Sequence, residues 1–119
     1  METKKRVELL APAGNMEKLK TAFHFGADAC FVGGSAFNLR GMSSNFKNKE
    51  LKEAVDYVHS LGKKIYVTLN IFAHNTEIEY MPRFIKKLDE FGVDAVIVAD
   101  LGVFQMVRQH APNLKIHVS

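Results

Sequence analysis

Short apolar runs recur along the chain, and between them apolar residues return every three or four positions. The short runs are rich in β-branched and aromatic residues, which is typical of strands. Five such strands are expected, over residues 7–11, 29–32, 65–69, 95–99 and 115–118.

The two segments nearest the amino terminus have the spacing and the end signals of helices. The first helix is predicted to begin after an N-cap at Asn15 and to stop at Gly26. The second is predicted to run from an N-cap at Asn48 to Gly62, with apolar residues at spacings of three and four.

Two further helices follow. The third has capping-box spacing at Thr76 and Glu79, places Pro82 in its first turn and ends at Gly92. The fourth covers roughly residues 103–110.

Strands and helices therefore alternate strictly, which predicts parallel strands covered by helices. The sequence Phe-Gly-x-Asp-Ala occurs at 25–29 and again at 91–95, each time between a helix and a strand. A repeated junction favours a barrel of βα repeats over a doubly wound sheet. Five strands are too few for an eight-stranded barrel, and no helix covers the last one. We therefore expect residues 1–119 to be one domain, the truncated first half of a TIM-type (β/α) barrel.

Composition narrows the class of protein further. Hydrophobic residues make up 47% and charged residues 24% of the 119 residues, as in soluble globular domains. No apolar run approaches the ~20 residues that span a bilayer, so no membrane partner is expected and the predicted location is the cytoplasm. A net charge of +3 permits an anionic ligand without requiring nucleic acid. The single cysteine, Cys30, excludes an intramolecular disulfide and a metal site of several thiolates within this chain.

Candidate site residues follow from the barrel expectation, because barrels place their chemistry where strands end and loops begin. The candidates for substrate binding are Asn15, Asn38, Arg40 and Asn70, and the candidates for catalysis are His74 and Asp100.

Several of these residues also have a purely structural interpretation. Asn70 shares a strand side with Tyr66 and Thr68, which suits a barrel interior opening towards a site, but it also suits an asparagine that binds loop backbone. Asp100 is either a general base or the cap of the following helix, and the sequence favours the cap. Arg40 is either a clamp for a phosphate or carboxylate or a solvated loop residue.

Metal and nucleophile motifs are missing from the sequence. None of the five histidines belongs to an HExxH or another local metal spacing, and we expect no metal or cofactor in this segment. His74, which follows a strand, is the histidine expected near the chemistry, while His117 is a residue that can point into the barrel. Cys30 lies in a short apolar strand and is expected to be a buried small hydrophobe.

Several motifs in order resemble one known family. They are residues 8–15 (ELLAPAGN), 26–29 (GADA), 32–34 (VGG), 37–40 (FNLR), 67–70 (VTLN), 92–100 (GVDAVIVAD) and 116–119 (IHVS). Together they closely resemble the start of the collagenase-like peptidase family, number thirty-two of the peptidases of unknown catalytic type. The resemblance covers essentially the whole chain and implies bacterial-type members whose barrel continues beyond it.

The resemblance implies more than one function. The leading expectation is a collagenase-like protease, with the segment alone inactive. The alternative is an RNA-hydroxylation factor for transfer or ribosomal RNA, with an iron–sulfur cluster held by cysteines in a later part of the chain. A third possibility is a binding or scaffold domain without chemistry. A hydrolase needs an activated nucleophile or a metal-bound water, and the residues of this segment provide neither. The expected partner is thus a peptide or an RNA, and the open sheet edges predict self-association of the segment.

Overall fold

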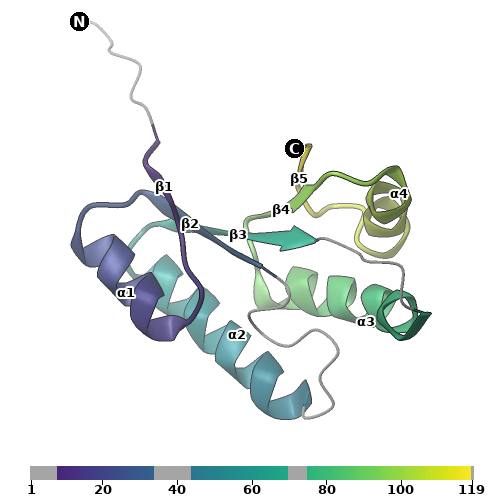
Figure 1. Cartoon of the computed structure of the whole chain (residues 1–119), viewed down its shortest axis with the longest axis horizontal. Coiled ribbons are helices and arrows are strands. Elements are labelled where there is room, and N and C mark those ends of the chain that lie inside the picture. Colours follow the sequence, from purple (N-terminus) through teal and green to yellow (C-terminus); the bar gives the residue numbers. More distant parts are fainter. Residues whose placement is uncertain (1–7, 34–43, 70–74, 119) are drawn as a thin grey trace, which may run out of the picture.

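The computed structural model describes residues 8–33, 44–69 and 75–118, with side chains for 8–33, 50–69 and 81–118. Five strands and four helices alternate along it (Figure 1). The strands are β1 (Leu10–Pro12), β2 (Ala29–Gly33), β3 (Lys64–Leu69), β4 (Ala95–Val98) and β5 (Ile116–Val118). The helices are α1 (Met16–His24), α2 (Ser44–Ser60), α3 (Asn75–Phe91) and α4 (Leu101–His110).

The five strands form one parallel sheet in the order β1-β2-β3-β4-β5. Each connection moves one strand further in the same direction, and right-handed crossovers then put every helix on the same face. A doubly wound sheet reverses its strand order and carries helices on both faces. The sequential order therefore confirms the prediction of a (β/α) half barrel.

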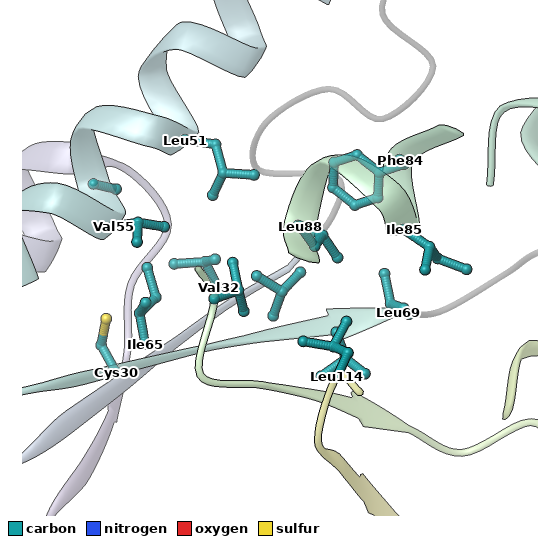
Figure 2. Close-up of a cluster of buried hydrophobic side chains, with 14 of the residues drawn as sticks. Cys30, Val32, Leu51, Val55, Ile65, Leu69, Phe84, Ile85, Leu88 and Leu114 are labelled. Carbon is teal, nitrogen blue, oxygen red and sulfur yellow. The ribbon is translucent and has the colours of Figure 1, made fainter. Parts of the chain in front are cut away.

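The helix-covered face of the sheet holds the main core. Alternate strand residues such as Ile65 and Val67 point towards the helices and are fully buried there. Figure 2 shows how Leu51 of α2 and Leu88 of α3 meet the strand side chains from above the sheet. Each such aliphatic side chain contributes about 1.5–3 kcal/mol on burial. The apolar stripe predicted for α3 is likewise buried at Met81, Phe84, Ile85 and Leu88.

The opposite face of the sheet, which we call the inner face, carries Phe31, Tyr66, Thr68, Ile97 and His117. Tyr66 of β3 lies opposite Phe31 of β2, and Thr68 lies opposite Ile97 of β4. Tyr66 packs with Ala29 and Ala95 in a small cluster. The small cluster on this face contains strand residues alone. Tyr66 and Thr68 were predicted to share a strand side, and the register confirms it.

The two Phe-Gly-x-Asp-Ala repeats form the same junction twice. Gly26 and Gly92 end α1 and α3 with φ of 103° and 85°, in the left-handed region that favours glycine. Asp28 then accepts a hydrogen bond from the backbone N–H of Leu9 at 2.8 Å, and Asp94 accepts one from that of Ile65 at 2.8 Å. Each aspartate thus ties the start of its own strand to the start of the previous one.

Two helix starts differ from the prediction. Asn48 was expected to cap the second helix, but α2 begins at Ser44 and Asn48 lies inside it. An interior asparagine costs only about 0.7 kcal/mol relative to alanine, so it does not stop a helix whose later turns are buried. Pro82 and the capping box at Thr76 were expected at the start of the third helix, yet α3 begins at Asn75 and Pro82 lies in its interior. The buried stripe that follows Pro82 outweighs the hydrogen bond that the proline removes.

Two other elements are displaced by a few residues. The first strand was expected over 7–11, but β1 spans Leu10–Pro12. Pro12 is tolerated because β1 pairs with β2 alone among the described strands, so the missing N–H faces no partner. The fourth helix begins at Leu101, two residues earlier than expected, directly after its cap.

Candidate functional site

Asn15 lies between β1 and α1 and caps that helix. Its backbone is extended, with φ −159° and ψ 178°, and its side-chain Oδ1 accepts a hydrogen bond from the backbone N–H of Lys18 at 2.8 Å. This confirms the predicted N-cap. The substrate-binding role of Asn15 stays a prediction. The oxygen of its amide already accepts the hydrogen bond from the helix.

Asp100 holds the corresponding position between β4 and α4. Its carboxylate accepts a hydrogen bond from the backbone N–H of Gly102 at 3.3 Å, so the favoured interpretation as a helix cap is confirmed. Its side chain is exposed and also borders a small apolar cavity of about 270 Å³ with Leu101 and Val118. A role for Asp100 as a general base stays a prediction.

The other four candidates, Asn38, Arg40, Asn70 and His74, lie outside the described residues. Of the six candidates, the structure therefore places Asn15 and Asp100, and the site roles of all six stay predictions. Both follow the carboxyl ends of parallel strands, so they lie at the same edge of the sheet. They stand on strands separated by β2 and β3.

A cavity of about 580 Å³ opens at this edge, at the carboxyl ends of β1, β2 and β3. We call it the carboxyl-end cavity. Its lining consists of Pro12, Ala13, Gly14, Lys18, Phe31, Gly33 and Thr68. Its volume falls within the range of about 300–1,000 Å³ that small-molecule sites occupy. In (β/α) barrels this is the edge at which active sites lie.

The chemistry of the carboxyl-end cavity is that of a binding site with a flat apolar wall and one cation. The ring of Phe31 is half-buried and provides the apolar surface. The Thr68 hydroxyl makes a long hydrogen bond of 3.4 Å to the Val32 carbonyl, so it can also bond a ligand. Lys18, on the first turn of α1, is exposed and brings a positive charge. No carboxylate or imidazole lines the cavity among the described residues, and Lys18 is its one titratable side chain there.

A second polar group lies on the inner face and was not foreseen from the sequence. The Tyr66 hydroxyl donates to the carboxylate of Glu8, 3.3 Å from each oxygen, and the Tyr66 ring meets the His117 ring edge-on at 5.3 Å between centroids. Burial, and then the negative charge of Glu8, raise the pKa of Tyr66 above its usual value. The two-residue alternation that placed Tyr66 and His117 on the inner face was the signal available.

Metal ligands do not gather in the part of the chain that the structure describes. No group of three or more His, Cys, Asp or Glu side chains could hold an ion there. Cys30 is buried, as expected, and burial, followed by the charge of Asp94, raises the pKa of its thiol to about 12. These residues do not fit an iron–sulfur cluster, whose ligands are cysteine thiolates.

The His59–Asp94 pair lies at the other edge of the sheet. His59 Nε2 is 2.8 Å from the Asp94 carboxylate, which also accepts the Ile65 N–H. Because this is the amino end of the strands, the pair has a structural interpretation rather than a catalytic one. No local spacing in the sequence joins His59 to Asp94, since the two residues are 35 positions apart.

None of the described helices is long and apolar enough to cross a membrane.

Curated relatives match nearly all of the chain. The tRNA hydroxylation protein P1 of Bacillus subtilis is 47% identical over 97% of this chain. The 23S rRNA 5-hydroxycytidine C2501 synthase of Escherichia coli is 40% identical over 96% of it. The chain spans 27% of the length of the first relative and 17% of the second.

Solved structures support the fold. The hydroxymethylglutaryl-CoA lyase of Pseudomonas aeruginosa superposes on 99% of this chain with a TM-score of 0.71 at 12% identity, and the chain covers 46% of it. At this level of identity the likeness concerns the fold alone. The lyases are TIM barrels, and this chain matches half of one.

These relatives correct the leading functional expectation. An uncharacterized protease of Methanocaldococcus jannaschii is 36% identical over 95% of the chain, but relatives at 38–47% identity are named tRNA hydroxylation proteins. The expectation of a collagenase-like protease is therefore wrong, and the resemblance misled because the family name records a peptidase activity. The resemblance itself is confirmed, since residues 14–119 match the family model. The chain belongs to peptidase family U32.

Proposed function

We propose that this chain is part of an RNA-hydroxylation protein and forms the portion of a (β/α) barrel that meets the RNA. The observation that carries the proposal is the 47% identity, over 97% of the chain, to a tRNA hydroxylation protein. A relative named for 5-hydroxycytidine synthesis in 23S rRNA extends the support to ribosomal RNA. The common element of these names is hydroxylation of RNA, and transfer RNA is the favoured substrate because more of the relatives carry it in their names.

The geometry supports a binding role within that function. The carboxyl-end cavity has a cation at Lys18, an aromatic wall at Phe31 and a hydroxyl at Thr68. An RNA phosphate can pair with Lys18, a base can stack on Phe31, and the edge of that base can form a hydrogen bond with the Thr68 hydroxyl. These three groups can bind RNA, and the described lining holds no carboxylate or imidazole, so we assign to this part of the barrel the positioning of the RNA.

The redox chemistry of hydroxylation needs groups that this part of the chain does not bring together. The described residues form no cluster-binding set. We propose that an iron–sulfur cluster, where one is used, is held by cysteines outside the residues that the structure describes. A protein that modifies transfer RNA works where that RNA is, so we also propose a cytoplasmic location.

Nucleoside mass spectrometry of cellular RNA tests the proposal. Transfer and ribosomal RNA are purified from the source cells and from cells lacking the gene for this chain, digested to nucleosides and compared. The proposal predicts that at least one hydroxylated nucleoside falls in the deletion strain and returns when the gene is supplied on a plasmid. Unchanged levels of every hydroxylated nucleoside would contradict it.

A further inference from the structure

The carboxyl-end cavity has a wall, a rim and a polar contact that match the three parts of a nucleotide. Phe31 lies on the inner face in register with Pro12 and Tyr66, and its half-buried ring packs against the small cluster that contains Tyr66. Thr68 lies two residues beyond Tyr66 on β3, opposite Gly33, and so stands nearer the open edge than Phe31. Lys18 comes from the first turn of α1 and stands at the rim.

Bases that undergo chemistry must leave their stack. Enzymes that modify a base take it out of the helix or loop and hold it in a pocket by stacking and by hydrogen bonds to its edge. A ring such as Phe31 is a suitable stacking surface, since aromatic side chains stack on bases in most single-stranded RNA sites. Gly14 and Gly33 also line the cavity, and a Cβ at Gly14 would meet nothing within 4 Å.

We propose that the carboxyl-end cavity holds the unstacked pyrimidine nucleotide of the RNA, with its base against Phe31, its base edge near the Thr68 hydroxyl and its phosphate near Lys18. The proposal rests on the proposed function for the choice of a pyrimidine, because one relative is named for hydroxycytidine synthesis. The wall, the hydroxyl and the cation rest on the cavity itself.

The charge around the cavity agrees with this arrangement. No ion pair of Lys18 is found among the described residues, whereas Lys20 on the same helix lies over the Tyr57 ring at 5.3 Å. Lys18 is therefore the cation of α1 that can meet a phosphate at the cavity. Lys20 provides a matched control, since it has the same charge on the same helix and does not line the cavity.

Calorimetric titration of this chain with cytidine 5′-monophosphate tests the proposal. Cytidine, which lacks the phosphate, and ribose 5-phosphate, which lacks the base, are titrated in parallel. The proposal predicts that cytidine 5′-monophosphate binds more tightly than either, and that ribose 5-phosphate binds weakest because stacking contributes most. If ribose 5-phosphate binds as tightly as the full nucleotide, the cavity is an anion site and the proposal is overturned. It is equally overturned if the nucleotide does not bind.

Substitutions locate the binding in the cavity. Phe31→Leu should raise the dissociation constants of cytidine and the nucleotide by about 5- to 150-fold, the loss expected for one stacked base. Lys18→Gln should raise that of the nucleotide by up to about 5-fold and leave cytidine unaffected, while Lys20→Gln changes neither. Thr68→Val should raise the dissociation constants of both ligands, because it removes the hydroxyl while it keeps the shape of the side chain.

The substitutions remain decisive even if one of them disturbs folding. Should Phe31→Leu fail to fold by circular dichroism, Lys18→Gln and Thr68→Val decide, since one is on the surface and the other conserves volume. Equal effects of Lys18→Gln and Lys20→Gln would overturn the proposal. The deletion strain tests the proposed function separately from the titrations. If the nucleotide does not bind in the titration, the proposed function still stands. If the deletion strain keeps all its hydroxylated nucleosides, the ligand specificity measured for this cavity still stands.

Discussion

The carboxylate of Asp94 accepts a hydrogen bond from the backbone N–H of Ile65 at 2.8 Å and so joins the start of β4 to the start of β3. The same oxygen lies 2.8 Å from His59 Nε2, at the end of α2. Asp28 makes the corresponding bond to the backbone of Leu9, with Lys63 Nζ 3.7 Å from its other oxygen. The repeated Phe-Gly-x-Asp-Ala sequence thus repeats a structural bond at the amino edge, opposite the candidate site.

Replacing Asp94 by alanine should destabilise the fold. The Ile65 N–H is partly buried and would lose its acceptor, which costs about 1–3 kcal/mol of unfolding free energy. Urea denaturation measures the change. Asp56→Ala is the matched control, because Asp56 pairs with Lys52 on the exposed face of α2 and should cost less than about 1 kcal/mol. Equal losses for the two variants would show that the Asp94 bond does not stabilise the sheet.

Two glycine substitutions should have opposite signs. Gly92 has a φ of 85°, so Gly92→Ala forces a left-handed backbone on a side chain and should lower stability by about 1–2 kcal/mol. Gly102 lies in α4 without such a φ, and a Cβ there would meet Asp100 Oδ2 at an ordinary 3.5 Å. Gly102→Ala should therefore raise stability by up to about 1 kcal/mol. Thermal melting of both variants checks the signs, and a stabilised Gly92→Ala would contradict the account of the junction.

The order of elements could be predicted from the sequence because local signals determine it. Period-two alternation placed Tyr66 and Thr68 on one side, and cap residues such as Asn15 and Asp100 mark helix starts within a residue or two. The starts of α2 and α3 were misplaced because packing of later turns overrides the local signals at Asn48 and Pro82.

The candidate site was predictable only in position. The strand-end rule indicated the carboxyl edge, where Asn15 and the carboxyl-end cavity lie. Phe31 and Lys18 were missed. In the sequence Phe31 is one residue of an apolar strand and Lys18 is one of several charged residues of a helix, and only the fold brings them to the same cavity. The Asp94–Ile65 bond was missed for the same reason, since its partners are 29 residues apart.

The Cys30 thiol should be unreactive in the folded protein and should link stability to alkaline pH. Its pKa is raised from 9.0 to about 12, so the folded state resists ionisation that the unfolded state undergoes. This contribution to stability is fully present below about pH 9 and is lost as the pH rises towards about 12. Iodoacetamide at about pH 8 should label Cys30 only after urea is added. Rapid labelling of the native chain would contradict the burial of this strand.

The sheet edges predict self-association of this chain. Among the described strands β1 and β5 each pair on one side only, and Leu9, Leu10 and Val118 are exposed beside them. Unpaired edges and exposed apolar side chains favour pairing with another chain. Sedimentation velocity at micromolar concentration should therefore show a dimer. A stable monomer would show that the exposed edges are protected, and the prediction would fail.

The central claim is that the carboxyl-end cavity meets the RNA that is hydroxylated, and one measurement tests it most directly. Nucleoside mass spectrometry compares transfer and ribosomal RNA from cells whose single gene copy encodes the unchanged chain, Lys18→Gln, Thr68→Val or Lys20→Gln, with equal protein levels verified by immunoblot. The account predicts a fall in a hydroxylated pyrimidine nucleoside for Lys18→Gln and Thr68→Val, and an unchanged level for Lys20→Gln. Wild-type levels in all three strains would contradict it.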